Sequence, residues 1–129
     1  MEDIQYIEIT AEEVYNSLYR YMKSEKVAFK LNDGTKYIGA IKDNMIRGCV
    51  RYMRMKNGDM RYKTDYVLSE HRGNGIYHTL CDYREATCIE SERITAFCTE
   101  MSLRSYLMMG FKKISVSDSG ITFVEKSRK

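Results

Sequence analysis

The stretch that decides the fold reads Asp65-Tyr66-Val67-Leu68-Ser69-Glu70-His71-Arg72-Gly73-Asn74-Gly75-Ile76-Tyr77-His78-Thr79-Leu80. Strand-forming residues run up to Leu68, and helical spacing begins at Ile76. Between them, two glycines allow backbone N–H groups to converge on one point, and the first turn of the following helix adds its own amides and the positive end of its dipole. The pattern predicts a strand, a tight loop and a helix that together bind an anion.

The composition is that of a soluble globular protein, with 129 residues, 43% hydrophobic and 30% charged, and a net charge of +3. We therefore expect a single domain over residues 1–129. No apolar run approaches the length of a membrane span, and the N-terminus is acidic where a signal peptide would be basic, which predicts a cytoplasmic protein with no membrane partner. No CxxC pair and no histidine at ligand spacing accompany the cysteines, so we expect reduced, mostly buried thiols and no metal. They are Cys49, Cys81, Cys88 and Cys98.

The residues before the loop predict one helix and a series of strands. A strand over Ile4–Ile9 is followed by Thr10-Ala11-Glu12-Glu13, a capping box that starts a helix reaching Ser24. Turns at Asp33-Gly34, Asp43-Asn44 and Asn57-Gly58 separate the strands that follow. These strands are expected at Val27–Leu31, Tyr37–Ile41, Met45–Met55 and Met60–Leu68.

After the loop, helices and strands alternate. The first helix is expected to reach about Ile89, and its buried side to consist of Ile76, Tyr77, Leu80, Cys81, Tyr83, Thr87 and Cys88. The next strand runs parallel to the strand before the loop, because a helix joins them. The remaining elements are a strand over Arg93–Cys98, a helix over Glu100–Met109 that Thr99 caps and Gly110 ends, and hairpin strands over Phe111–Val116 and Ile121–Glu125.

Basic side chains are concentrated in the two strands before the loop and in the turn between them. They are Arg47, Arg51, Arg54, Lys56, Arg61 and Lys63. Strand alternation places Arg47 and Arg51 on one face and Arg54 and Lys56 on the other, so they form no single stripe. A solvated sheet edge accounts for this charge, and so does attraction to nucleic acid or to an acidic acceptor, helped by the basic tail at residues 126–129.

Two motifs resemble those of the GCN5-related N-acetyltransferase (GNAT) superfamily. Residues Arg72-Gly73-Asn74-Gly75-Ile76-Tyr77 are similar to the acyl-CoA-binding motif Arg/Gln-x-x-Gly-x-Gly/Ala, with Tyr77 where the family has Gly or Ala. Its bulky side chain either turns away from the phosphates or crowds the cofactor. Residues Tyr106-Leu107-Met108-Met109-Gly110-Phe111 are similar to the Tyr-x-x-x-Gly-Phe signature that closes the acetyltransferase core, with Thr99 where an Asn often stands.

The resemblance implies an α+β fold of three layers, in which a mixed, mostly antiparallel sheet splays at its centre and carries helices on both faces. The family needs one strand fewer before the loop than the residues predict, and usually has two helices where they predict one. Acetyl-CoA would be the co-substrate. Its pantetheine arm would lie on the free backbone of Val67, Leu68 and Ser69, and its pyrophosphate on Arg72, Gly73, Asn74, Gly75, Ile76 and Tyr77.

The reaction implied by the resemblance is transfer of an acetyl group to a primary amine by direct attack, on a small-molecule or protein acceptor. Tyr106 stands where the family keeps the phenol that protonates the departing thiolate. Asp65, which interrupts an apolar strand end, and Glu100, at the start of a helix, are the candidate general bases.

Two other functions fit the same residues. A GNAT-like protein that modifies nucleic acid, of the phage Mom type, would use the basic strands. A catalytically inactive GNAT-like module would bind a partner or ligand without turnover, as the departures at Tyr77 and Thr99 suggest. Exposed tyrosines on the first helix would also fit a homodimer.

Overall fold

The computed structural model describes residues 3–128, which form seven strands and three α-helices. The elements are β1 (Gln5–Ile9), α1 (Ala11–Ser24), β2 (Lys36–Lys42), β3 (Met45–Arg54), β4 (Met60–Val67), the 3-10 turn η1 (Ser69–His71), α2 (Ile76–Thr87), β5 (Arg93–Cys98), α3 (Glu100–Met108), β6 (Lys112–Val116) and β7 (Thr122–Ser127). The strands form one mostly antiparallel sheet in the order β1-β2-β3-β4-β5-β7-β6. This confirms the predicted fold class. The N-terminal Met1 and Glu2, and Lys129 of the basic tail, lie outside the described residues.

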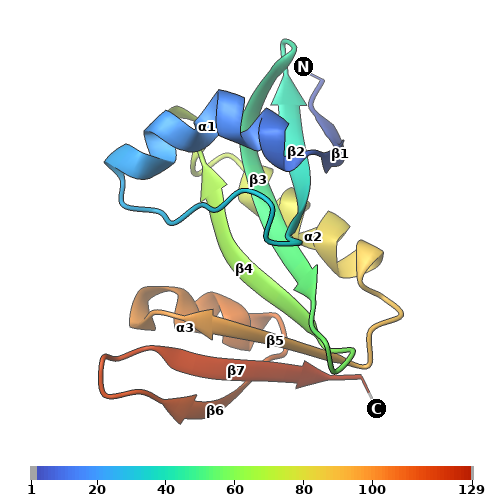
Figure 1. Cartoon of the computed structure of the whole chain (residues 1–129), viewed down its shortest axis with the longest axis vertical. Coiled ribbons are helices and arrows are strands. Elements are labelled where there is room, and N and C mark those ends of the chain that lie inside the picture. The colour runs from blue at the N-terminus through green and yellow to red at the C-terminus, as the bar shows by residue number, and fades with distance from the viewer. Residues whose placement is uncertain (1–2, 129) are drawn as a thin grey trace. The chain divides into compact units, whose positions relative to one another are not determined.

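The chain divides into two compact units, whose boundaries fall within β3 and β4 and directly after α2. The first unit comprises the residues up to Tyr52 together with Thr64–Ile89, and the second comprises Met53–Lys63 and the residues from Glu90 onward. The first therefore contains β1, β2, α1 and α2, and the second contains β5, β6, β7 and α3 (Figure 1).

Helix α1 forms where the sequence predicts it, because its capping box closes. The Glu13 amide donates to Thr10 Oγ1 at 3.1 Å, and the Thr10 amide donates to Glu13 Oε1 at 2.9 Å. Its apolar side lies on one face of β2, β3 and the end of β4 (Figure 1). The core on this face consists of Ile9, Val14, Leu18, Met22, Tyr37, Cys49, Tyr66 and Leu68.

Helix α2 lies on the opposite face of the first unit's strands (Figure 1). Its buried side chains are Ile76, Leu80, Cys81 and Arg84. The prediction that Tyr77, Tyr83 and Thr87 belong to this buried side is wrong, since all three are exposed. The Tyr83 ring stacks instead on Tyr6 of β1, with 5.1 Å between ring centres. Arg84 occupies the inward position because Asp65 of β4 neutralises it there.

The segment between α1 and β2 is not a strand, contrary to the prediction for Val27–Leu31. Its alternating residues Val27 and Phe29 pack against the core under α1. The guanidinium of Arg51 on β3 donates to Ala28 O at 2.9 Å. Side-chain packing and one arginine thus hold this segment in place. The additional strand that the sequence predicted before the glycine loop, beyond those the family needs, does not form.

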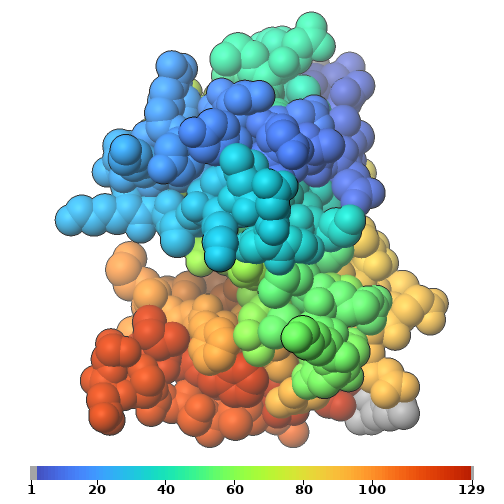
Figure 2. All heavy atoms as spheres, viewed as in Figure 1, coloured from blue at the N-terminus to red at the C-terminus, as the bar shows by residue number. Residues whose placement is uncertain are grey.

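Aromatic rings join α1 to this segment. Tyr15 and Tyr19 stack with 4.7 Å between ring centres, and each lies 6.1 Å from the ring of Phe29. Figure 2 shows the atoms of α1 (blue) and of the following segment (cyan) adjoining on this face of the first unit. These two tyrosines therefore take part in packing within the unit.

In the second unit, β5 pairs with two strands, β4 and β7, and its predicted parallel pairing with β4 is confirmed. It is antiparallel to β7 over its whole length and parallel to β4 at Met60–Tyr62, while β6 and β7 form the expected hairpin. Helix α3 ends at Met108, and Gly110 two residues later has the expected positive φ of 94°. Thr99 is the N-cap residue, but its hydroxyl contacts Ser102 Oγ at 3.3 Å and does not cap the backbone.

The four cysteines are buried free thiols, as predicted. Within residues 3–128, no three side chains of His, Cys, Asp or Glu are grouped so that they could hold a metal ion. No helix in that range is both long and apolar enough to cross a membrane.

Gly48 of β3 lies tightly against the end of β4. A Cβ at this position would lie 2.9 Å from Tyr66 O and 3.0 Å from Val67 Cα, which are backbone atoms. We expect G48A to displace this strand end and to lower the free energy of unfolding by about 1–3 kcal/mol, measured by urea denaturation. The control is G39A, whose Cβ would lie nearest to atoms of the flexible Ile9 side chain and not to backbone. A loss in G39A equal to that in G48A would contradict this account.

Candidate functional site

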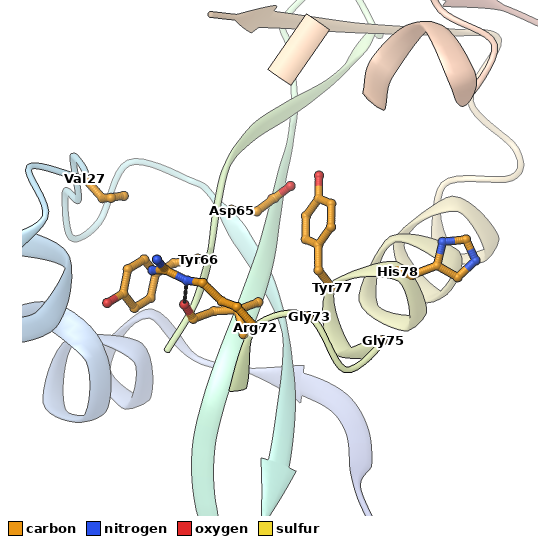
Figure 3. A pocket seen from close by; sticks show the side chains of 9 residues that line it. Val27, Asp65, Tyr66, Arg72, Gly73, Gly75, Tyr77 and His78 are labelled. Carbon is orange, nitrogen blue, oxygen red and sulfur yellow. Dashed lines mark hydrogen bonds between the residues drawn. The ribbon is translucent and has the colours of Figure 1, made fainter. Parts of the chain in front are cut away.

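A pocket of about 650 Å³ opens beside the end of β4 in the first unit (Figure 3). Three segments line it, and their residues are Val27, Asp65, Tyr66, Val67, Arg72, Gly73, Gly75, Tyr77 and His78. The stretch at residues 65–80 thus supplies all of these residues except Val27. The sequence did not predict Val27 as a pocket residue, because its position beside the pocket depends on the path of the chain after α1.

The glycine loop has an open conformation. Gly73 and Gly75 have φ angles of 80° and 91°, in the region that favours glycine. A Cβ at either position would meet no other atom within 4 Å. Helix α2 begins directly afterwards, and Thr79 N donates to Gly75 O at 3.1 Å as its first helical hydrogen bond. The amides before that bond and the helix dipole favour an anion over the loop.

The side chain of Arg72 turns away from the glycines and toward Tyr66 (Figure 3). Its Nε donates to Val67 O at 2.7 Å, and its Nη2 donates to Glu25 Oε1 at 2.7 Å. The Arg72 guanidinium carbon lies 5.4 Å from the centre of the Tyr66 ring. The Tyr66 hydroxyl donates to the other carboxylate oxygen of Glu25. One arginine therefore links the loop to the residue that ends α1.

Hydrogen bonding and burial set the protonation states of Glu25 and Tyr66. The Tyr66 hydroxyl, and then Arg72, lower the pKa of Glu25 below its usual value. Burial, and then Glu25, raise the pKa of Tyr66 to about 12. At neutral pH Tyr66 is therefore a neutral donor, and Glu25 is a carboxylate that Arg72 neutralises.

The backbone at the end of β4 is less free than the sequence interpretation assumed. Leu68 N donates to Arg47 O at 2.8 Å, and Leu68 O accepts from His71 N at 2.8 Å. Ser69 O accepts from Arg72 N at 3.3 Å, so that amide also has a partner. Because Arg72 Nε donates to Val67 O, a ligand that bonds to this carbonyl either shares it with the Arg72 side chain or displaces that side chain.

Asp65 forms a buried ion pair with Arg84, which is fully buried. Its Oδ1 accepts from Arg84 Nη1 at 2.7 Å, and its Oδ2 accepts from Arg84 Nη2 at 3.1 Å. Oδ1 also accepts from the Arg51 amide at 3.2 Å. Both oxygens of this candidate base therefore accept hydrogen bonds, which connect β4 to Arg84 of α2 and to the Arg51 amide of β3. Beside it, the Tyr77 ring extends away from Gly73 and Gly75 (Figure 3).

A family model described as an acetyltransferase (GNAT) domain matches residues 5–126. The chain belongs to the GNAT acetyltransferase family. The match includes both the glycine loop and the segment around Tyr106. No curated protein matches this GNAT sequence.

Solved structures share the fold of this GNAT chain. A GNAT-family acetyltransferase from Staphylococcus aureus is 21% identical, with a TM-score of 0.75, covering 98% of this chain and 100% of that chain. An acyl-CoA N-acyltransferase from Pseudomonas aeruginosa is 14% identical, with a TM-score of 0.77 and coverages of 97% and 100%. PaiA N-acetyltransferase from Thermoplasma acidophilum, in complex with coenzyme A, is 16% identical, with a TM-score of 0.72 and coverages of 97% and 99%. At these identities the likeness establishes the fold.

The other two candidate catalytic residues of the GNAT chain belong to helix α3 in the second unit. Tyr106 is 6% exposed, and its ring meets Phe111 edge-on with 5.1 Å between ring centres. Glu100 is the first residue of the helix and is exposed. The roles of these two residues remain predictions.

The basic strands of the GNAT chain do not place all their charge on the surface. Arg51 is 5% exposed, and its head group is used inside the first unit. Arg47 donates to Lys42 O at 3.2 Å and lies 4.0 Å from the carboxylate of Asp43. These contacts give both arginines structural partners within the fold.

Proposed function

We propose that this GNAT protein moves an acetyl group from acetyl-CoA to a primary amine by direct attack. The observation that carries the proposal is the glycine loop at the start of α2, which is open above Gly73 and Gly75 and lies in the wall of the 650 Å³ pocket. Converging amides, a helix N-terminus and a nearby guanidinium are the donors that suit a pyrophosphate. A structural neighbour that is a coenzyme A complex adds support.

The residues that would hold the acyl donor are those that the family resemblance implies. The amides of Gly73, Asn74, Gly75, Ile76 and Tyr77 would bind the phosphates, with the guanidinium of Arg72. The backbone of Val67, Leu68 and Ser69 would bind the pantetheine arm. Because the Tyr77 ring extends away from the two glycines, the structure favours an accessible loop over a crowded one (Figure 3).

The chemistry supplied by the bound donor is a thioester carbon that accepts an amine. The C–N bond of the amide forms and the C–S bond breaks. We assign to Tyr106 the proton that the departing thiolate takes up, and to Asp65 or Glu100 the proton that the amine loses. The acceptor is a small-molecule or protein amine.

The proposal is tested first by donor binding. At a hundred times its dissociation constant, acetyl-CoA should add about 2.7 kcal/mol to the free energy of unfolding, which a thermal-shift titration detects. Release of the coenzyme A thiol in the presence of a panel of amines then tests turnover. No thermal shift would contradict the proposal. Binding without turnover on any amine would indicate an inactive GNAT-like module, and DNA retention that falls steeply with salt would indicate a nucleic-acid-modifying relative.

Gly75 offers a specific test of the loop. In G75V, a side chain would extend into the open space above the loop. We expect the affinity for acetyl-CoA to fall by about tenfold or more, equivalent to about 1.4 kcal/mol, in calorimetric titration. The control is G58V, at a glycine with a matching φ of 92° and equally open surroundings in the turn before β4. G58V should carry the same backbone strain and bind acetyl-CoA normally. Equal affinity losses in both variants would contradict the assignment.

The base is tested by D65N and E100Q. Loss of turnover at neutral pH by about 10²-fold or more in one variant, with normal acetyl-CoA binding, would assign that residue. Since D65N also alters the ion pair with Arg84, R84M serves as its control. A loss in D65N that R84M reproduces would come from packing. Full turnover in both D65N and E100Q would exclude both residues as the base.

A further inference from the structure

Three features of the first unit converge on one point beside the pocket. Glu25 supplies a carboxylate as the C-cap residue of α1. The C-terminal end of a helix adds partial negative charge. Tyr66 supplies the face of an aromatic ring, and its hydroxyl holds the second carboxylate oxygen of Glu25 in place. A carboxylate, a helix C-terminus and an aromatic face all attract positive charge, so this group is a cation site.

The cation that occupies the site belongs to the chain itself. Arg72 Nη2 lies 2.7 Å from Glu25 Oε1, and its guanidinium carbon lies 5.4 Å from the Tyr66 ring centre. The Arg72 and Glu25 side chains are 46% and 36% exposed. An ion pair with this degree of exposure is weak, so each partner can be exchanged for another ion.

A pyrophosphate bound over the glycine loop would compete with Glu25 for the Arg72 guanidinium. Arg72 directly precedes Gly73, yet its side chain turns away from the glycines (Figure 3). A pyrophosphate over the loop would attract the guanidinium, and to reach it the side chain must leave Glu25 and Val67 O. Glu25 would then lose its counter-ion at the negative end of α1. Tyr66 and Val27 line the same pocket as the loop, so the vacated site would be reached from that pocket.

We propose that Glu25 and Tyr66 form the subsite for the protonated amine of the acceptor, and that Arg72 occupies this subsite until the phosphates of the acyl donor draw it to the glycine loop. The ligand class is a primary alkylammonium ion, the form that predominates for such amines at neutral pH. The order of events rests on the proposed function, whereas the cation site itself does not. Donor binding thus opens the place where the acceptor is collected.

The test removes the resident cation. The probe is n-butylammonium chloride, titrated into R72A and followed by NMR through the amide of residue 25 and the ring of Tyr66. We expect saturable shifts in R72A, binding about tenfold or more weaker in R72A/E25Q, and no binding of the neutral control n-butanol. Wild-type protein alone should bind the probe about tenfold more weakly than R72A does, and wild-type protein saturated with coenzyme A should match R72A.

Several outcomes would overturn the inference. R72A that binds the probe no better than the wild type, or R72A/E25Q that binds it as well as R72A, would exclude the cation site. Coenzyme A that binds without improving binding of the probe would exclude the exchange. The single variant E25Q should bind coenzyme A at least as tightly as the wild type, and weaker binding would mean that Glu25 instead positions Arg72 for the donor. If coenzyme A does not bind at all, the proposed function fails, while R72A and R72A/E25Q still decide the cation site.

Discussion

Replacement of Tyr106 by Phe is expected to lower kcat by about 10²–10⁴-fold, the contribution typical of a positioned general acid. The substitution removes the phenolic proton and keeps the ring that packs edge-on against Phe111. The affinity for acetyl-CoA should therefore stay within about twofold of the wild type, equivalent to about 0.4 kcal/mol. Steady-state kinetics that separate kcat from KM, together with calorimetric titration of acetyl-CoA, measure the two effects.

The second unit offers a matched control in Tyr62. This tyrosine is also buried, at 2% exposed, and its ring lies 5.9 Å from the same Phe111. Y62F removes a buried hydroxyl next to the same ring, so it should cost similar stability and leave kcat unchanged. Wild-type kcat in Y106F, or an equal loss in Y62F, would show that Tyr106 is not the acid.

Replacement of Arg84 by Met is expected to destabilise the protein by about 3–5 kcal/mol, because it removes one partner of a buried ion pair and leaves the other charge buried. Arg84 is fully buried, and the Asp65 side chain is 9% exposed. Arg84 also donates to the backbone carbonyl of Arg51 at 3.0 Å, so the substitution frees a second buried acceptor. Urea denaturation gives the free energy of unfolding.

A double variant separates the effect of the unpaired charge from the effect of the changed packing. In R84M/D65L both charges are removed, and since apolar replacements of a buried pair are often neutral, most of the stability should return. R20M provides a surface control on α1, where the exposed Arg20 guanidinium lies on the exposed Tyr21. Its effect should stay within about 0.5 kcal/mol. If R84M costs no more than R20M, the Asp65–Arg84 pair does not hold α2 to β4.

Features set by neighbouring residues could be predicted from the sequence. The capping box of α1 depends on Thr10 and Glu13, which lie three residues apart. The turn after α3 depends on Gly110 alone, because its positive φ favours glycine. The glycine loop likewise combines two glycines with the start of a helix. In each case the physical cause lies within one turn of the chain.

Features set by distant partners could not be predicted. Alternation at Val27–Leu31 is typical of a strand, but packing under α1 and the bond from Arg51 to Ala28 decide its structure. The burial of Arg84 was not predicted, because a lone arginine is costly to bury and only the pairing with Asp65 offsets that cost.

The site shows the same dependence on distance. Asp65 was singled out as an unusual charge at an apolar strand end, yet no pattern in the sequence connects it to Arg84. Glu25 was not singled out, since 47 residues separate it from Arg72 and the contact exists only in the folded chain. Composition and periodicity report burial and secondary structure, and they carry no information on which charges meet.

The two-unit division has a consequence for dissecting this protein. The first unit is discontinuous, because the chain leaves it after Tyr52 and returns at Thr64. A fragment ending at Ile89 would keep the pocket residues, but it would also carry Met60–Tyr62 without the β5 residues that pair with them. Such a bare strand edge, with the apolar Met60 and Tyr62 uncovered, is a template for aggregation. The pocket and its glycine loop therefore have no self-sufficient fragment, and any transplant of this site to another scaffold must bring the Met53–Lys63 hairpin and a strand to cover it.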